Sequence, residues 1–294
     1  MSEPSIVRVS VPGLWARKEA GERIVVLTAY DYPTAEILDR AGVDVLLVGD
    51  SLGMAVLGYE NTLAVTMEDM LHHVKPVARA ARRALVVADM PYLSFHVSAA
   101  DSVRNAGRFL KEGGAQAVKI EGASPSRLDL VRTLVEAEIP VMGHVGLTPQ
   151  SVNRLGQFKV QGGEGGAGAA IIRGAESLEA AGVFAVVLEC IPLEVAAEIT
   201  KRLRIPTIGI GAGPHCDGQV LVFHDLIGYS RGYMPKFVRR YADLDGEVER
   251  AVRAYAGDVR DGSFPADEHC YHLKPAEKAR LKAALAGRKS GGGA

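Results

Sequence analysis

Seven short apolar runs, rich in β-branched residues, constrain the fold of this chain more than any other feature. They cover residues 24–31, 43–50, 84–91, 117–122, 140–146, 184–192 and 206–213. Near-continuous apolar runs of this length are typical of strands that are buried on both faces of a parallel sheet. The chain is therefore expected to contain at least seven parallel strands.

The segments between these runs carry apolar residues at helical spacing. Met67, Met70 and Leu71 follow this spacing after a capping residue, Thr66, and a later helix is expected to end near Gly114. Alternating strands and helices in a chain of 294 residues, 48% of them hydrophobic, predict a (β/α)8 TIM barrel in a single domain. An open, doubly wound sheet is the alternative.

Periodicity does not decide where the eighth strand lies. Residues 218–228 and residues 235–238 are both candidates. We assign residues 1–273 to the barrel and 274–294 to a C-terminal extension. This extension holds six basic residues and one acidic residue, and is predicted to be a solvated helix followed by a disordered tail.

Composition narrows the kind of partner that this chain would bind. The 34 Lys and Arg residues nearly balance the 35 Asp and Glu residues, and the barrel segments hold no basic stripe that would favour nucleic acid. The chain also has no signal-like start and no apolar run of about 20 residues that a membrane span needs. A cytoplasmic protein that binds a small anionic or neutral metabolite is expected.

Three carboxylates stand where apolar runs stop: Asp50, Asp89 and Glu121. The carboxyl ends of barrel strands meet at one mouth, so these side chains would repel one another without a cation between them. Oxygen ligands of this kind favour Mg²⁺. The alternative is that Asp50 and Asp89 cap the following helices and that Glu121 is an ordinary loop acid.

Six motifs in the same order resemble the ketopantoate hydroxymethyltransferase family. They are V-G-D-S-L-G-M (48–54), A-D-M-P-Y (88–92), V-K-I-E-G (118–122), G-H-V-G-L-T-P-Q (143–150), L-E-C-I-P (188–192) and I-G-I-G-A-G (208–213). The similarity runs from about residue 24 to about residue 272. It implies a barrel of the phosphoenolpyruvate and isocitrate lyase type, dependence on Mg²⁺, and a decameric homo-oligomer in the cytoplasm.

The resemblance also implies a reaction, the transfer of a hydroxymethyl group from 5,10-methylenetetrahydrofolate to 3-methyl-2-oxobutanoate through an enolate. The roles it implies for single residues are metal binding by Asp50, Asp89 and Glu121, substrate binding by Asp50, Ser51, Asp89 and Lys119, and catalysis by Glu189 as the C3 base with His144. Without the resemblance, Lys119 could be a surface lysine, Ser51 a turn residue and His144 a core histidine. Two other functions stay open: a Mg²⁺-dependent 2-oxo acid lyase or hydrolase, and a non-catalytic 2-oxo acid binding protein.

Residues 148–170 form a long polar stretch that becomes rich in glycine, which is typical of a mobile lid. The chain departs from the family here, because Gly163 and then Glu164 follow V-Q-G where the family usually has a basic residue. We expect the affinity for the folate to be the property that this departure affects.

Overall fold

The computed structural model describes residues 7–157, 159–230 and 234–286. The chain divides into two compact units, residues 1–242 and residues 243–294. Within the described residues, no helix is both long enough and apolar enough to span a bilayer.

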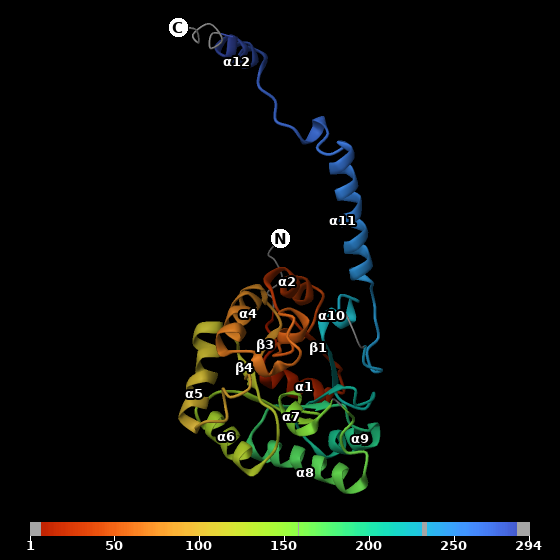
Figure 1. The fold of residues 1–294 in the computed structure, drawn as a ribbon. Coiled ribbons are helices and arrows are strands. Elements are labelled where there is room, and N and C mark those ends of the chain that lie inside the picture. Colours follow the sequence, from red (N-terminus) through yellow and green to blue (C-terminus); the bar gives the residue numbers. More distant parts are fainter. Residues whose placement is uncertain (1–6, 158, 231–233, 287–294) are drawn as a thin grey trace. The chain divides into compact units, whose positions relative to one another are not determined.

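Unit 1 is built on a closed barrel of eight parallel strands (Figure 1). The strands are β1 (Ile24–Thr28), β2 (Val45–Val48), β3 (Leu85–Asp89), β4 (Ala117–Lys119), β5 (Val141–Gly146), β6 (Ala185–Glu189), β7 (Thr207–Ile210) and β8 (Gly218–Leu221). Each strand pairs with the next, and β8 pairs with β1. The predicted barrel is confirmed and the open sheet is wrong. The eighth strand lies in the first of its two candidate segments.

Helices surround the barrel, and one precedes it. They are α1 (Val11–Ala20), α2 (Tyr32–Arg40), α3 (Leu52–Ala55), α4 (Met67–Ala80), α5 (Ala99–Arg108), α6 (Pro125–Glu136), α7 (Val152–Leu155), α8 (Gly165–Ala181), α9 (Leu193–Arg202) and α10 (Phe223–Leu226). Short turns of other helix types are η1 (Thr62–Ala64), η2 (Phe109–Gly113) and η3 (Pro149–Ser151). Residues 211–217 join β7 to β8 directly, with no helix between them.

Alternate residues along the strands fill the inside of the barrel. Val45, Leu47, Leu85 and Val87 belong to one buried cluster, together with Leu14 of α1. The intervening residues, such as Leu46, belong to a larger cluster between the strands and the outer helices. Because side chains alternate across a strand, the residues that continue the inner set at each strand end face the barrel mouth.

The glycine-rich stretch that we predicted to be a lid is partly helical. It begins with η3 and α7, and its last residues form the first turns of α8. Gly163 and Glu164 lie just before α8, and Glu164 takes the N-cap position without a side-chain cap. Residue 158 lies outside the described residues.

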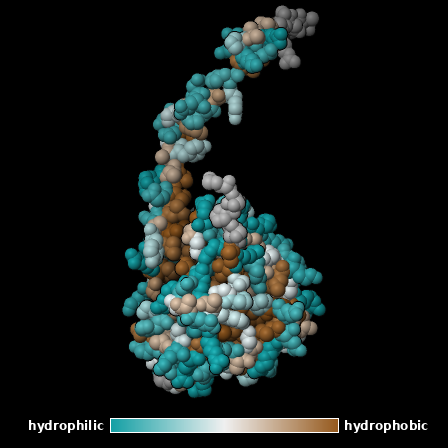
Figure 2. Space-filling model, turned by 180° about the vertical axis from the view of Figure 1, so that it is seen from behind, coloured by the Kyte–Doolittle hydropathy of each residue, from teal (hydrophilic) through white to brown (hydrophobic). Residues whose placement is uncertain are grey.

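Unit 2 holds α11 (Leu244–Asp261), the turn η4 (Asp267–His269) and α12 (Pro275–Ala286). On α11, Val248, Val252, Tyr255 and Val259 are exposed and follow helical spacing, which produces the hydrophobic stripe along this helix in Figure 2. Helix α12 lies within the predicted C-terminal extension. The last residues of that extension, 287–294, where a disordered tail was expected, fall outside the described residues.

Candidate active site

The strand register brings several polar side chains together at the carboxyl end of the barrel. Asp89, Lys119, Glu121, His144 and Glu189 all share the alternation of the inner residues on β3 to β6. The first four side chains are almost fully buried, and that of Glu189 is 18% exposed. Buried charges need partners, so the contacts among these groups decide what the site can do.

Lys119 and Asp89 form a buried ion pair across β3 and β4. Lys119 Nζ lies 2.9 Å from Asp89 Oδ1, while Asp89 Oδ2 accepts a hydrogen bond of 3.1 Å from the backbone N–H of Asp50. Burial alone would lower the pKa of Lys119, but Asp89, Glu121 and Asp50 outweigh it and raise the pKa above its usual value. Lys119 is therefore a fixed cation among three acids.

Asp50 and Glu121 are both held by Gln150 of η3. Gln150 Nε2 donates to Asp50 Oδ2 at 2.8 Å and to the carbonyl oxygen of Met90 at 3.0 Å. The backbone N–H of Gln150 donates to Glu121 Oε2 at 3.2 Å. Gln150 ends the motif G-H-V-G-L-T-P-Q, but its role was not predicted, because a polar loop residue carries no periodic signal.

Lys119 compensates only part of the negative charge of Asp50 and Glu121. Burial, and then the charge of Asp89, raises the pKa of Asp50 to about 7. Burial, and then the charge of Asp50, raises the pKa of Glu121 well above its usual range. An added cation would relieve both effects.

His144 links Lys119 to Glu189. Its Nδ1 lies 3.4 Å from Lys119 Nζ, and its Nε2 lies 3.2 Å from Glu189 Oε2. Burial, and then the nearby charge of Lys119, lowers the pKa of His144, which favours the neutral ring. Because the ammonium can only donate, Nδ1 accepts and the ring proton is on Nε2, beside the Glu189 carboxylate.

Ser51 follows Asp50 at the start of α3. Its Oγ lies 2.8 Å from the hydroxyl of Tyr30, which is fully buried. A Cβ at Gly49 would lie 2.8 Å from Ser51 Oγ and 3.3 Å from Asp89 Oδ2, so glycine leaves room for both side chains. Tyr30 was not singled out from the sequence, since a single tyrosine after a strand carries no distinct signal.

The structure thus brings the sequence-predicted residues into one connected cluster. Within the described residues, however, no three His, Cys, Asp or Glu side chains lie close enough to bind a metal ion by themselves. Mg²⁺ commonly keeps several waters and takes only one or two protein carboxylates. The buried oxygen atoms of Asp50 and Asp89, and the raised pKa values of Asp50 and Glu121, fit such a cation.

Solved structures share this barrel fold. Phosphoenolpyruvate phosphomutase from Streptomyces platensis subsp. rosaceus superimposes with a TM-score of 0.59 at 15% identity, covering 96% of this chain and 98% of that one. A 2,3-dimethylmalate lyase of the PEP mutase/isocitrate lyase superfamily gives a TM-score of 0.56 at 16% identity, covering 96% and 99%. The chain therefore has the same barrel fold as these two proteins.

Sequence comparison identifies the family. The ketopantoate hydroxymethyltransferase family matches residues 8–267. The chain is 53% identical over 269 residues to 3-methyl-2-oxobutanoate hydroxymethyltransferase of Syntrophomonas wolfei, covering 92% of this chain and 97% of the relative. It is 56% identical over 264 residues to that of Moorella thermoacetica, covering 90% and 98%. This chain belongs to the ketopantoate hydroxymethyltransferase family and is an enzyme.

Proposed function

We propose that this enzyme transfers a hydroxymethyl group from 5,10-methylenetetrahydrofolate to 3-methyl-2-oxobutanoate, giving ketopantoate for pantothenate synthesis. The observation that carries the proposal is the chain of contacts from Asp89 through Lys119 and His144 to Glu189. At one end of this chain of contacts, Lys119 could bind an anionic substrate. At the other end, the Glu189 carboxylate could act as a base. The names of the relatives support the same reaction.

Asp50 and Asp89 would hold Mg²⁺, and Glu121 would contribute directly or through a water molecule. When bound, the cation supplies a Lewis acid that stabilises negative charge on the 2-oxo oxygen of the substrate. Lys119 binds the negative charge of the keto acid, and Ser51 binds the keto acid through its hydroxyl or backbone N–H. Tyr30 orients that hydroxyl.

Glu189 takes the proton from C3 of the keto acid, and the enolate then attacks the methylene carbon of the folate. One new C–C bond forms as the bond from the methylene carbon to N10 of the folate breaks, and N10 takes up the proton that Glu189 removed. Water then displaces N5 from the same carbon, leaving its hydroxyl group there and its other proton on N5, so that tetrahydrofolate leaves. His144 stays neutral in this scheme, and its buried Nε2, which has no hydrogen-bond partner among the described residues, lies 3.2 Å from the Glu189 carboxylate that it would position. Its role is therefore positioning rather than proton transfer to the substrate.

We further propose that the enzyme works in the cytoplasm as a homo-oligomer, with a decamer as the size that the resemblance implies. The exposed apolar stripe of α11 supports self-association, because large exposed apolar patches commonly mark protein interfaces.

Proton exchange and product formation test the reaction. The protein is incubated with 3-methyl-2-oxobutanoate and Mg²⁺ in D₂O, with and without methylenetetrahydrofolate, and followed by NMR. We expect C3 deuteration in both mixtures and ketopantoate only with the folate. Cleavage or hydrolysis of a 2-oxo acid without folate would favour a superfamily lyase or hydrolase, and binding without exchange would favour a non-catalytic protein.

A further inference from the structure

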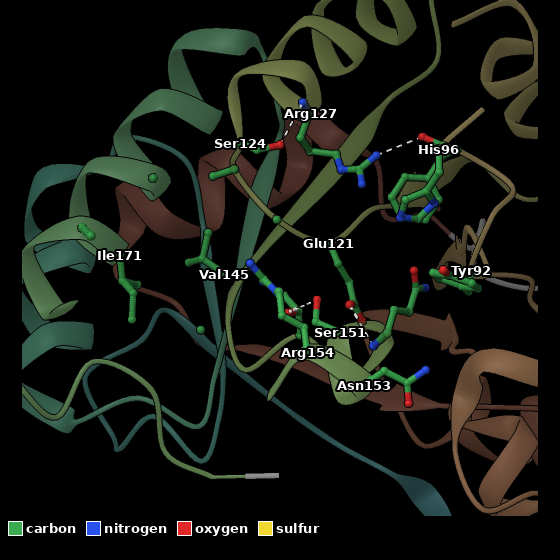
Figure 3. Close-up of a pocket in the computed structure, with 18 of the residues that line it drawn as sticks. Tyr92, His96, Glu121, Ser124, Arg127, Val145, Ser151, Asn153, Arg154 and Ile171 are labelled. Atoms are coloured by element: carbon green, nitrogen blue, oxygen red, sulfur yellow. Dashed lines mark hydrogen bonds between the residues drawn. The ribbon is translucent and has the colours of Figure 1, made fainter. Parts of the chain in front are cut away.

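A cavity of about 620 Å³ opens outward from Glu121, and the proposed chemistry leaves most of it unused. Its walls come from the segment after β3, the start of α6, the η3–α7 segment and α8. Figure 3 draws Glu121 between Arg127 on one side and Arg154 on the other. The volume lies within the roughly 300–1,000 Å³ of small-molecule sites and exceeds the needs of a five-carbon keto acid.

Arg127, from the first turn of α6, places its positively charged guanidinium at this cavity. Its Nη1 donates to the carbonyl oxygen of Phe95 at 2.9 Å, and its guanidinium carbon lies 4.1 Å from the centre of the Phe95 ring. Its buried Nε has no hydrogen-bond partner among the described residues. Burial lowers the pKa of Arg127 to about 10, so it remains a cation at neutral pH.

Arg154, from α7, is the second cation. Neither arginine forms a salt bridge within the described residues, although Glu121, which lines the same cavity, acts on Arg127 through its charge. Two cations at one cavity, neither of them in a salt bridge, favour an anionic ligand. This anion is distinct from the keto acid, because Lys119 already stands beside the acids at the inner end.

Aromatic side chains form the wall beside Arg127. The ring centres of Phe95 and His96 are 4.2 Å apart, and those of Tyr92 and His96 are 5.2 Å apart. These three residues line the cavity, while Val145 and Ile171 add apolar surface. A flat ring that carries carboxylates on its far side would match both the aromatic wall and the arginines.

We infer that this cavity binds the p-aminobenzoylglutamate arm of the folate co-substrate. Arg127 and Arg154 meet the glutamate carboxylates, and the aromatic wall packs against the benzoyl ring. The inference rests on the proposed function, because it assumes that the one-carbon donor is a folate. The inference agrees with the geometry. When the methylene carbon lies at the barrel mouth, the p-aminobenzoylglutamate arm must extend outward from it, and the cavity also opens outward from Glu121.

A donor without the glutamate tests the inference. Methylenetetrahydrofolate and methylenetetrahydropteroate, which lacks the glutamate, are compared as donors by kcat/KM. We expect the wild-type enzyme to prefer the glutamate form by roughly tenfold or more, the effect of losing charged hydrogen bonds. Arg127→Gln and Arg154→Gln should each reduce that preference several-fold, mainly through KM for the glutamate form.

Arg132→Gln on the same helix is the matched control, because Arg132 is exposed and pairs with Asp129. It should keep the wild-type preference. Since the two test arginines lie on different helices, a folding defect in one variant, detected by thermal unfolding, leaves the other informative. If folded variants at both positions keep the full preference, the inference is wrong even though ketopantoate forms. If the wild-type enzyme neither exchanges the C3 proton nor makes ketopantoate, the proposed function itself fails.

Discussion

Glu189 is the residue on which the proposed chemistry depends most directly. We predict that Glu189→Gln lowers the rate of C3 proton exchange by about 10²–10⁴-fold, because the amide cannot accept the proton. Binding of the keto acid, measured by calorimetry with Mg²⁺, should remain within a few-fold of the wild type, since Lys119 and Ser51 are untouched.

Glu194→Gln, a few residues further on at the exposed start of α9, provides the control and should exchange normally. Normal exchange in the Glu189→Gln enzyme would mean that another group is the base.

The cysteines should differ in reactivity. Burial, and then the charge of Glu189, raises the pKa of Cys190 to about 12, and burial raises that of Cys216 to about 11. Only the thiolate reacts with iodoacetamide, so native protein at pH 8 should be alkylated mainly at the exposed Cys270. Mass spectrometry of tryptic peptides measures which cysteines are alkylated. Rapid labelling of Cys190 would contradict the raised pKa of its thiol.

At the scale of elements, Asp39 of α2 holds the backbone of residues 82–84, the segment that leads into β3. Its carboxylate accepts hydrogen bonds from the backbone N–H groups of Arg82, Arg83 and Ala84 at 2.7–3.2 Å. We predict that Asp39→Ala lowers the free energy of unfolding by about 3 kcal/mol, because it leaves several donors without an acceptor. Urea denaturation followed by circular dichroism measures the loss.

Asp129→Ala is the comparison variant, since Asp129 is exposed and forms only a surface ion pair. A change within about 0.5 kcal/mol is expected there. Equal stability of the two variants would show that the Asp39 contacts do not hold β3.

The strands were predictable because seven of them are short, near-continuous apolar runs rich in β-branched residues. The eighth strand was ambiguous because it begins at Gly218, where only the folded structure shows that glycine is needed. A side chain at that position would collide with Ile24 and Ile208 of the neighbouring strands. Helix α1 went unpredicted, although Ser10 caps it and Leu14 fills the end of the barrel interior. Site residues at strand ends were predictable because they stand where apolar runs stop and within motifs that resemble a family, whereas Gln150 and Tyr30 act through contacts that only the folded chain creates.

At the scale of the whole molecule, the apolar stripe of α11 predicts an assembly that a charge would weaken. Val252→Asp places a carboxylate in the stripe, and we expect it to reduce the molar mass measured by light scattering. Ala254→Asp introduces the same group at an exposed position on another face of the helix and should leave the mass unchanged. An unchanged molar mass in the Val252→Asp protein would show that α11 does not form the subunit interface.

The short segment formed by η3 and α7 joins the cluster of acids at the barrel mouth to the outer cavity, two sites that could otherwise act separately. Gln150 holds the acids at the barrel mouth, and Arg154, four residues later, lines the outer cavity. Any displacement of Gln150 by an arriving ligand would be transmitted to Arg154 through one turn of helix. Occupancy of one place should therefore change affinity at the other, and by thermodynamic reciprocity the effect must be equal in both directions.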